Sequence, residues 1–426
     1  MSDTNLLLPE KLPVSKVRVL TASLVGTAVE FYDFYIYATA AALVFGALFF
    51  PTSQPGLAQL LSYASFSVAF FARPLGAVAF GHFGDRIGRK STLVASLLIM
   101  GCSTFAIAFL PPYAAIGWAA PVLLCLLRFG QGFGLGGEWG GATLLAVENA
   151  PEGQQWRYGM VPQFGAPLGF IASNGLFLLL GLWLDEGQFK DWGWRIPFLG
   201  SALLVGVGLW VRLRLTETPA FAQASATGQP NKIPFVTLMR DYWREVLCGS
   251  FAAITAFAIF YLTTAFALGY GTKTLGIARE TFLLYQLFAI LFLALGIGIS
   301  GVLSDRYSSR VVLISGALLT LVIAQFLAPL LSGSPAQIMV FLSGALFAMG
   351  LVYGPLGSWL PSLFPPLVRY SGASVAFNMA GVLGGGLAPI LAQALADRYG
   401  LGAVGYYLSG CAAASLIGLL SLRAKA

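Results

Sequence analysis

The sequence predicts an all-α membrane protein with twelve transmembrane helices arranged as two pseudo-symmetric six-helix bundles. Composition is the first reason. Of the 426 residues, 58% are hydrophobic and 10% are charged, whereas about a quarter of the residues of a soluble domain are charged. The mean hydropathy is +0.80. The alternation of apolar and polar residues that a membrane β-barrel needs does not dominate the chain.

Repeated apolar runs are the second reason, because a spanning helix needs about 20 mostly apolar residues. In the first half the predicted spans are residues 18–49, 57–81, 91–110, 116–147, 158–183 and 195–215. In the second half they are residues 246–270, 281–303, 310–331, 336–359, 370–396 and 402–422. An even number of spans places both ends of the chain on one side of the membrane.

A charged turn that occurs twice is the third reason. GHFGDRIGRK, from Gly81 to Lys90, separates the second and third spans, and GVLSDRYSSR, from Gly301 to Arg310, separates the eighth and ninth. Two copies about half a chain apart indicate two similar halves in tandem. The longest polar stretch between spans, from Thr216 to Arg244, has the composition of a linker. The predicted parts are a tail at 1–17, bundles at 18–215 and 246–422, a linker at 216–245 and a tail at 423–426.

The net charge of +7 reflects topology rather than nucleic-acid binding. With both termini in the cytoplasm, 17 Lys and Arg residues fall on the cytoplasmic side and five on the outer side. The positive-inside rule therefore predicts this orientation in a bacterial inner membrane. Four cysteines without a C-x-x-C spacing and one histidine predict no metal site and no cofactor.

Ionisable residues inside apolar spans are costly and mark functional sites. All of those in this chain lie in the first half: Glu30, Asp33, Arg73, Arg128 and Glu138. The acids of the second half lie at or beyond the predicted helix ends. We therefore expect any charge-based coupling to reside mainly in the amino-terminal half.

Glu30, Asp33 and Tyr37 have the spacing i, i+3 and i+7, which places them on one face of the first helix. A carboxyl group in a low-dielectric cavity has its protonated form favoured, so Glu30 and Asp33 are candidate proton carriers. The alternative is that one or both are permanently paired with an arginine of another helix. Two acids on one face favour the functional interpretation.

The fourth span contains RFGQGFGLGGEWGGA, with Gln131 and Glu138 on a shared face. Arg128 and Glu138 are separated by about 15 Å along a helix axis and cannot pair within it. The glycines form a ridge of small residues that lets another helix approach closely. Arg128 is either a buried structural cation or a contact for a substrate carboxylate, and we favour the carboxylate. Arg73 lies too deep to reach the cytoplasmic surface easily and is expected to have a buried partner.

Other polar residues within spans are candidate ligands, although each is more often a hydrogen bond between helices. The predicted substrate-binding residues are Tyr37, Arg73, Arg128, Gln131, Glu138, Gln163 and Asn378. Further polar residues of this kind are Asn174, Tyr261, Thr264, Tyr285, Gln286 and Tyr353.

The two charged turns supply the predicted gating residues Asp85, Arg86, Arg89, Asp305 and Arg306. Basic residues at a cytoplasmic turn are explained by topology alone. Topology does not explain an acid at such a turn. We therefore expect Asp85 to form an ionic contact with a neighbouring helix, a charge clasp, which breaks when the two halves move relative to each other.

Several of these motifs resemble known families. GHFGDRIGRK resembles the loop between the second and third helices of the major facilitator superfamily, and Arg128, Gly132 and Gly136 resemble its fourth-helix pattern. The finer resemblance is to its metabolite:proton symporter family. It rests on EFYDF, RPLG at Arg73, RFGQGFGLGGEWGGA, WRIPF at Trp194, LTETPAF at Leu215 and RYSGAS at Arg369.

The resemblance implies the major facilitator fold, alternating access, and proton-driven import of small metabolites that are usually anionic or zwitterionic. Six residues match the family pattern position by position: Glu30, Asp33, Arg73, Arg128, Gln131 and Glu138. Ser362, Pro366 and Leu367 depart from it, which puts the gating contacts of the second half in doubt. The matching clasp around Asp305 is expected to be the weaker one.

The leading hypothesis is therefore a proton-coupled symporter that imports a small organic metabolite, a carboxylate or a zwitterion. Its expected partners are that metabolite, protons and the lipid bilayer, with no nucleic acid, and the expected state is a monomer. The alternative within transport is a proton-driven exporter or a facilitator of a neutral or drug-like compound. A membrane enzyme would need a nucleophile with a base, or a metal set, and a sensor would normally carry a large soluble extension; we expect neither here.

Overall fold

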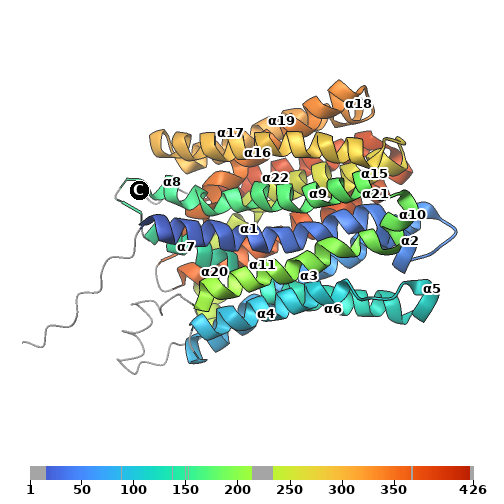
Figure 1. Cartoon of the computed structure of the whole chain (residues 1–426). Helices are drawn as coiled ribbons and strands as arrows, with labels where there is room; N and C mark the ends of the chain where they lie inside the picture. The colour runs from blue at the N-terminus through green and yellow to red at the C-terminus, as the bar shows by residue number, and fades with distance from the viewer. Residues whose placement is uncertain are drawn as a thin grey trace, which may run out of the picture.

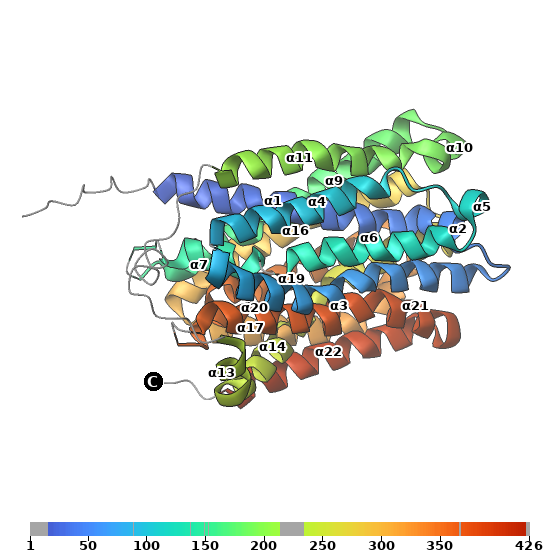
Figure 2. The same ribbon diagram turned by 90° about the horizontal axis from the view of Figure 1, so that it is seen from below.

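A computed structural model describes residues 16–87, 89–136, 138–148, 150–151, 153–213, 234–365 and 368–422. Long helices run side by side along one axis (Figures 1 and 2). α1 begins and α22 ends at the same end of this bundle, which we call the terminal end, and the other end is the opposite end. We refer to residues 16–213 as the first half and to residues 234–422 as the second half.

The described helices account for the predicted spans. Nine are long and apolar enough to cross a membrane, and a tenth forms if the bent pair Glu186–Gly193 and Arg195–Trp210 is one span. Two shorter apolar helices, Val94–Ile107 and Ser309–Gln325, supply the remaining crossings. The all-helical fold with twelve transmembrane helices is thus confirmed.

The helices of the first half follow the predicted order, with bounds that differ by a few residues. They are α1 (Lys16–Ala40), η1 (Ala41–Phe45) and α2 (Gly46–Phe49); α3 (Pro55–Ile87); α4 (Arg89–Ile107); α5 (Tyr113–Ile116); α6 (Ala119–Leu135) and α7 (Glu138–Glu148); α8 (Gln155–Met160), η2 (Pro162–Phe164) and α9 (Gly165–Trp183); α10 (Glu186–Gln188), η3 (Phe189–Gly193) and α11 (Arg195–Leu213). α3 continues past the predicted end of the second span into the charged turn.

The second half repeats this arrangement. Its helices are α13 (Pro234–Asp241); α14 (Trp243–Tyr261), η4 (Leu262–Phe266) and α15 (Ala267–Lys273); α16 (Arg279–Arg306); α17 (Ser309–Gln325) and α18 (Leu327–Leu331); α19 (Pro335–Ser362); α20 (Arg369–Ala380), η5 (Gly381–Gly386) and α21 (Leu387–Tyr399); α22 (Leu401–Ser421). The domain boundaries remain predictions, because residues 214–233 of the expected linker lie outside the described residues.

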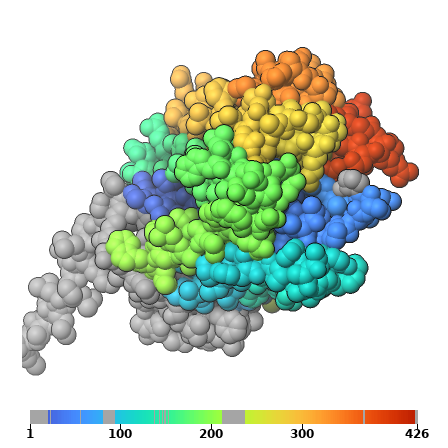
Figure 3. Space-filling view, turned by 45° about the vertical axis from the view of Figure 1, so that its right-hand side comes forward, coloured from blue at the N-terminus to red at the C-terminus, as the bar shows by residue number. Residues whose placement is uncertain are grey.

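Helices of the two halves pack directly against each other. α16 contacts α8 and α9, and α20 contacts α3 and α7. Figure 3 shows the α9 to α11 region, in green, lying against the yellow and orange surface of the second half. The residues along this contact between the two halves are therefore the ones to consider for a functional site.

Glycines bring α3 and α6 into backbone contact, as the sequence predicts for the fourth span. A Cβ at Gly132 would overlap the backbone of Ala69, and a Cβ at Gly136 would overlap the carbonyl oxygen of Arg73. Only a residue without a side chain fits such an approach. This contact fixes Arg73 and Arg128 relative to each other, because each arginine belongs to one of the two helices.

π-helical segments interrupt several spans and were not predicted. Among the described residues, η1, η3, η4 and η5 have this geometry. Such a segment breaks the regular ladder of backbone hydrogen bonds and is frequent at functional sites. In η1, for example, the carbonyl of Ala41 accepts hydrogen bonds from Ser62 Oγ at 2.7 Å and from Gln59 Nε2 at 3.2 Å.

Candidate functional site

Two buried arginines flank a single aromatic ring in the first half. The guanidinium carbons of Arg73 and Arg128 lie 4.2 Å and 4.1 Å from the centroid of the Phe34 ring. Arg128 also lies 4.1 Å from the centroid of Tyr37, and Arg73 lies 5.0 Å from that of Phe70. Aromatic faces attract cations, so these rings offset part of the cost of burying two positive charges.

Gln131 holds Arg128 in place. Its Oε1 accepts a hydrogen bond from Arg128 Nη1. Its Nε2 donates to the backbone carbonyl of Asp33 and to Thr104 Oγ1, both at 2.9 Å. Arg128 Nε also donates to the carbonyl of Phe66 at 3.3 Å. Gln131 therefore links α6 to α1 and α4 and orients the guanidinium.

The arginine pair retains unused hydrogen-bond donors. Arg128 Nη2 and Arg73 Nε are buried without a hydrogen-bond partner. The ion pairs found between described residues involve Arg157, Lys190, Arg240 and Arg279, and neither Arg73 nor Arg128 takes part in one of them. A buried guanidinium with free donors suits an anionic group such as a carboxylate.

All five ionisable residues predicted to lie inside spans are buried. The exposed fraction is 0% for Asp33 and Arg128, 5% for Arg73 and Glu138, and 7% for Glu30. Both carboxyl oxygens of Asp33 lack a hydrogen-bond partner. Glu30 interacts electrostatically with Arg73.

Glu138 and Tyr37 have partners in neighbouring helices. Glu138 accepts a hydrogen bond from Ser96 Oγ of α4 and interacts electrostatically with Asp33. The hydroxyl group of Tyr37 pairs with Ser65 Oγ of α3 at 2.8 Å. Both residues therefore contribute to the arrangement of the first half around Asp33 and the arginines.

A small cavity of about 20 Å³ lies between the two halves, which is room for about one water molecule. Its lining is mostly aromatic: Phe31, Tyr35, Ala256, Phe257, Phe260, Tyr261, Met349 and Tyr353. None of the predicted substrate-binding residues lines it in this conformation. Arg73 nevertheless interacts electrostatically with Tyr35, Tyr261 and Tyr353, and Arg128 interacts with Tyr261, so both arginines act on residues that line the cavity.

Cross-half contacts close the terminal side of this cavity. The rings of Trp139 and Phe377 stack in parallel, with centroids 3.6 Å apart and 2° between their planes. Asn378 Nδ2 donates to the carbonyl of Gly136 at 3.0 Å. Gln163 Nε2 donates to the carbonyl of Tyr353 at 3.0 Å. Gln163 and Asn378, predicted to bind substrate, thus join the two halves here.

The opposite side is closed as well. Tyr63 donates from its hydroxyl to the carbonyl of Ala265 at 2.8 Å, and Ser67 donates to the carbonyl of Gly386. Lys273 of the second half donates to Gln59 Oε1 of the first. Ala265 and Gly386 belong to η4 and η5, so the first-half hydroxyls bind carbonyls in the irregular parts of the second half.

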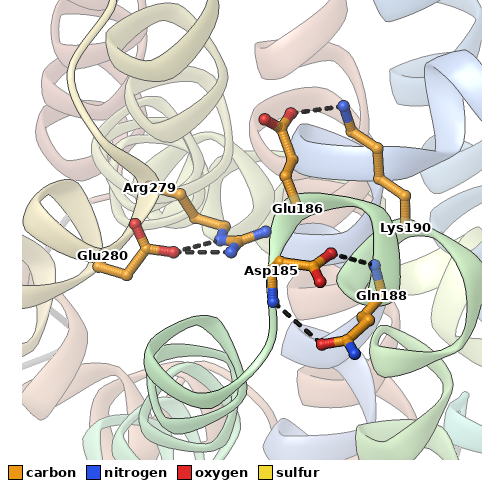
Figure 4. Close-up of polar contacts among 6 residues, drawn as sticks. All are labelled: Asp185, Glu186, Gln188, Lys190, Arg279 and Glu280. Atoms are coloured by element: carbon orange, nitrogen blue, oxygen red, sulfur yellow. Dashed lines mark hydrogen bonds and ion pairs between the residues drawn. The ribbon is translucent and has the colours of Figure 1, made fainter.

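An arginine of α16 adds to the contacts at the opposite end. The guanidinium carbon of Arg279 lies 3.7 Å from the centroid of Phe189 in η3, while its Nη2 pairs with Glu280 at 2.7 Å. Figure 4 shows this pair facing the loop at Asp185, whose carboxylate accepts a hydrogen bond from the backbone N–H of Gln188 at 2.8 Å and caps α10. Lys190 and Glu186 pair at 2.5 Å beside it.

The structure describes only part of the predicted gate. The side chains of Asp85, Arg86 and Arg89 lie outside the described residues. Asp305 forms an ion pair with Arg157 across the halves, although neither of its oxygens has hydrogen-bond geometry. Arg306 lies 5.6 Å from the ring centroid of its neighbour Tyr307.

Sequence reasoning named Tyr261 and Tyr353 as polar candidates but missed Phe34 and the other aromatic residues of the cavity lining: Phe31, Tyr35, Phe257 and Phe260. The runs EFYDFYIY and FAIFY carry these rings, but the chain has 33 Phe and 16 Tyr residues, so an individual ring gives no contrast. In the described part of the chain, no group of three or more His, Cys, Asp or Glu residues could hold a metal ion.

Comparisons with known proteins agree with this architecture. A family model described as the Major Facilitator Superfamily matches residues 23–389. The chain is 48% identical over 412 residues to an inner membrane metabolite transport protein of Escherichia coli, covering 95% of this chain and 94% of that protein. It is 39% identical over 416 residues to the shikimate transporter of Escherichia coli, covering 95% and 94%.

A solved structure shares the fold. The proton:xylose symporter XylE, a xylose transporter from Escherichia coli, superposes with a TM-score of 0.72 at 15% identity, covering 95% of this chain and 94% of that chain. At this identity the likeness concerns the fold alone. The match to the family model and the two relatives extend over nearly the whole length of the sequence. The chain therefore belongs to the major facilitator superfamily of membrane transporters.

Proposed function

We propose that this transporter is a proton-coupled symporter that imports a small organic metabolite bearing a carboxylate, by alternating access. The observation that carries the proposal is the arginine pair around Phe34. Arg73 Nε and Arg128 Nη2 are buried donors without a partner, and both guanidinium groups interact electrostatically with Tyr261, which lines the cavity between the halves. A substrate carboxylate would satisfy these donors and offset the two buried charges.

Asp33 is the proposed proton site, with Glu30 as the second candidate. A buried carboxyl group without a partner costs less free energy when it carries a proton than when it is ionised. The backbone of Asp33 is joined to Arg128 through Gln131. Protonation of Asp33 and binding at Arg128 therefore act on one connected group of residues, as coupled transport requires.

Alternating access follows from the two sets of cross-half contacts. The contacts of Gly136, Trp139 and Gln163 close the terminal side, and those of Gln59, Tyr63 and Ser67 close the opposite side. Breaking one set while keeping the other would open the cavity to one side of the membrane. The described conformation corresponds to the closed intermediate between the two open forms.

One relative supports the substrate class, because it is named a shikimate transporter and shikimate is a carboxylate. We propose that the protein is a monomer in the bacterial inner membrane. The distribution of basic residues supports an orientation with both termini in the cytoplasm. The site would also include Tyr37, Gln131 and Glu138. The hydrogen bonds that Gln163 and Asn378 donate across the halves would form when the site closes.

The second candidate is a proton-driven exporter, or a facilitator, of a neutral compound. The aromatic lining of the cavity favours it, because aromatic walls suit uncharged ligands. The unpartnered arginine donors favour the carboxylate, since a neutral ligand would bring no negative charge to the buried guanidinium groups.

Counterflow in proteoliposomes tests the proposal. Vesicles containing the wild-type protein are screened against carboxylates, zwitterions and neutral sugars, alongside Arg73→Gln and Arg128→Gln proteins. We expect exchange of at least one carboxylate and its loss in both variants. Exchange confined to neutral compounds, and unaffected by either substitution, would overturn the carboxylate assignment.

A further inference from the structure

One polar group that lines the cavity is left without a partner in the protein. The hydroxyl group of Tyr353 in α19 is buried beside the side chain of Trp139 and has no partner with full hydrogen-bond geometry. Tyr353 itself is 3% exposed. A buried polar group without a partner is costly, and most such groups in proteins are satisfied. The Tyr353 hydroxyl group therefore lacks the hydrogen-bond partner that a buried hydroxyl group normally has.

The ring of Tyr353 is held in position by the other half of the protein. Its backbone carbonyl accepts a hydrogen bond from Gln163 Nε2 at 3.0 Å. Its ring meets Phe31 edge to face, with centroids 6.4 Å apart and 77° between the planes. The side chain is thus fixed by contacts that do not involve the hydroxyl group.

Neighbouring polar side chains of the second half have partners. Thr264 Oγ1 donates to the carbonyl of Phe260 at 2.7 Å, and Gln286 Nε2 donates to the carbonyls of Thr263 and Thr264 at 2.9 Å and 2.8 Å. The described acids of the second half lie at helix ends, away from the cavity: Asp241, Glu245, Glu280, Asp305 and Asp397. The second half therefore offers a neutral hydrogen-bonding group at the cavity and no negative charge of its own. The acid that interacts electrostatically with Tyr353 is Glu30 of the first half, which interacts with Arg73 as well.

We infer that Tyr353 is the substrate anchor of the second half, and that the substrate is a hydroxy- or oxo-carboxylate bridging the two halves. Its carboxylate lies at Arg73 and Arg128 of the first half, and a hydroxyl or carbonyl group on its far side hydrogen-bonds to the Tyr353 hydroxyl. The aromatic lining contacts the carbon skeleton in between. This inference rests on the proposed carboxylate transport and names the second feature that the substrate must have.

Anchors in different halves also explain how a substrate could drive closure. A ligand that contacts both halves binds the closed form better than either open form, and only such a difference in affinity shifts a conformational equilibrium. A carboxylate without the far-side group would have only apolar contacts with the second half. It is therefore expected to bind without favouring closure to the same extent.

Matched ligands and a single hydroxyl deletion test this inference. Wild-type and Tyr353→Phe proteins are compared in binding and counterflow with three pairs: lactate and propionate, malate and succinate, and 3-hydroxycyclohexanecarboxylate and cyclohexanecarboxylate. Glycine betaine serves as a carboxylate whose other end is a quaternary ammonium group, which can contact the aromatic walls but cannot hydrogen-bond to the Tyr353 hydroxyl. Tyr407→Phe is the matched control, because Tyr407 of α22 also has a buried hydroxyl without a partner but does not line the cavity.

For at least one pair we expect the wild type to prefer the hydroxylated member by tenfold or more. Tyr353→Phe removes that preference, changes affinity for the other member less than twofold, and leaves the melting temperature of the protein unchanged or higher. Tyr407→Phe changes neither affinity.

If Tyr353→Phe leaves the preference intact, lowers the melting temperature, or affects both members equally, Tyr353 is not a substrate anchor although carboxylate transport stands. Preferred binding of glycine betaine in both proteins also overturns the inference. If the wild type binds no carboxylate at all, the proposed function itself fails.

Discussion

The side-chain amide of Asn378 in the second half donates a 3.0 Å hydrogen bond to the backbone carbonyl of Gly136, the residue that ends α6 in the first half. The last carbonyls of a helix have no partner within it. The break between α6 and α7 therefore exposes an acceptor at the contact between the halves, and Asn378 occupies it. A residue predicted to bind substrate here joins the two halves.

Replacing Asn378 should open the terminal end. Asn378→Ala removes one net hydrogen bond from the closed form, worth about 0.5–1.5 kcal/mol, so the ratio of open to closed molecules rises about twofold to tenfold. Electron paramagnetic resonance distances between paired spin labels measure this ratio. The labels replace Gln154 and Tyr307 at the terminal end, and Gly187 and Ser332 at the opposite end, after Cys102, Cys125, Cys248 and Cys411 have been changed to Ala.

Two matched variants control this measurement. Gln325→Ala removes a hydrogen bond to Ser409 inside the second half, 2.8 Å long, and should leave both distance distributions unchanged. Gln59→Leu removes the acceptor of Lys273 and should widen the opposite end instead. An Asn378→Ala protein that widens the opposite end, or neither end, would contradict the role of this contact.

Gly136 should tolerate no side chain. A Cβ at this position would overlap the carbonyl of Arg73 and the backbone nitrogen of Ala77, so Gly136→Ala forces α3 and α6 apart at a cost of about 1–3 kcal/mol. Thermal unfolding in detergent should show a lower melting temperature, with weaker carboxylate binding because Arg73 is displaced. Gly206→Ala is the control, since no atom lies within 4 Å of its added Cβ. Equal melting temperatures for the two variants would rule out the backbone contact.

Giving Arg128 a permanent counter-ion should abolish its attraction for substrate. In a Gln131→Glu protein the new carboxylate lies where Oε1 of Gln131 now accepts from Arg128. A hydrogen bond to a charged group is worth about 1.5–3 kcal/mol, so the KM for a carboxylate rises about tenfold to hundredfold. Kinetics of uptake provide the measurement.

Thr104→Val separates this effect from a general loss of packing. It removes two neutral hydrogen bonds, the one from Gln131 Nε2 to Thr104 Oγ1 and the one from Thr104 Oγ1 to the carbonyl of Met100, both 2.9 Å long. It should change KM less than threefold, on the order of a neutral hydrogen bond. Unchanged KM in Gln131→Glu, with full folding, would mean that Arg128 does not meet the substrate.

The sequence predicted those features that depend on apolar length and on isolated charges. The spans could be predicted because a run of about twenty mostly apolar residues is typical of a helix that crosses a membrane. Glu30, Asp33, Arg73, Arg128 and Glu138 stood out against an apolar background, and the structure confirms that all five are buried. Gly132 and Gly136 were predicted as a packing ridge, and their contacts with α3 confirm it.

The pairing between distant helices could not be predicted. Helical periodicity identifies neighbours on one helix, whereas Asn378 and Gly136 are 242 positions apart, and Gln163 and Tyr353 are 190 apart. The π-helical segments also gave no signal, because their residues are as apolar as those of the regular helices around them. The hydrogen bonds that Tyr63 and Ser67 donate to carbonyls of η4 and η5 were therefore missed together with these segments.

The central claim is that a proton on Asp33 drives accumulation of a carboxylate bound at the arginine pair. The most direct test is uptake by proteoliposomes under an imposed inward proton gradient, comparing wild-type and Asp33→Asn proteins, with counterflow in the absence of a gradient as the measure of intact binding. We expect that the wild type concentrates the substrate and that Asp33→Asn exchanges it but only equilibrates it. An Asp33→Asn protein that still accumulates substrate against its gradient would contradict the claim.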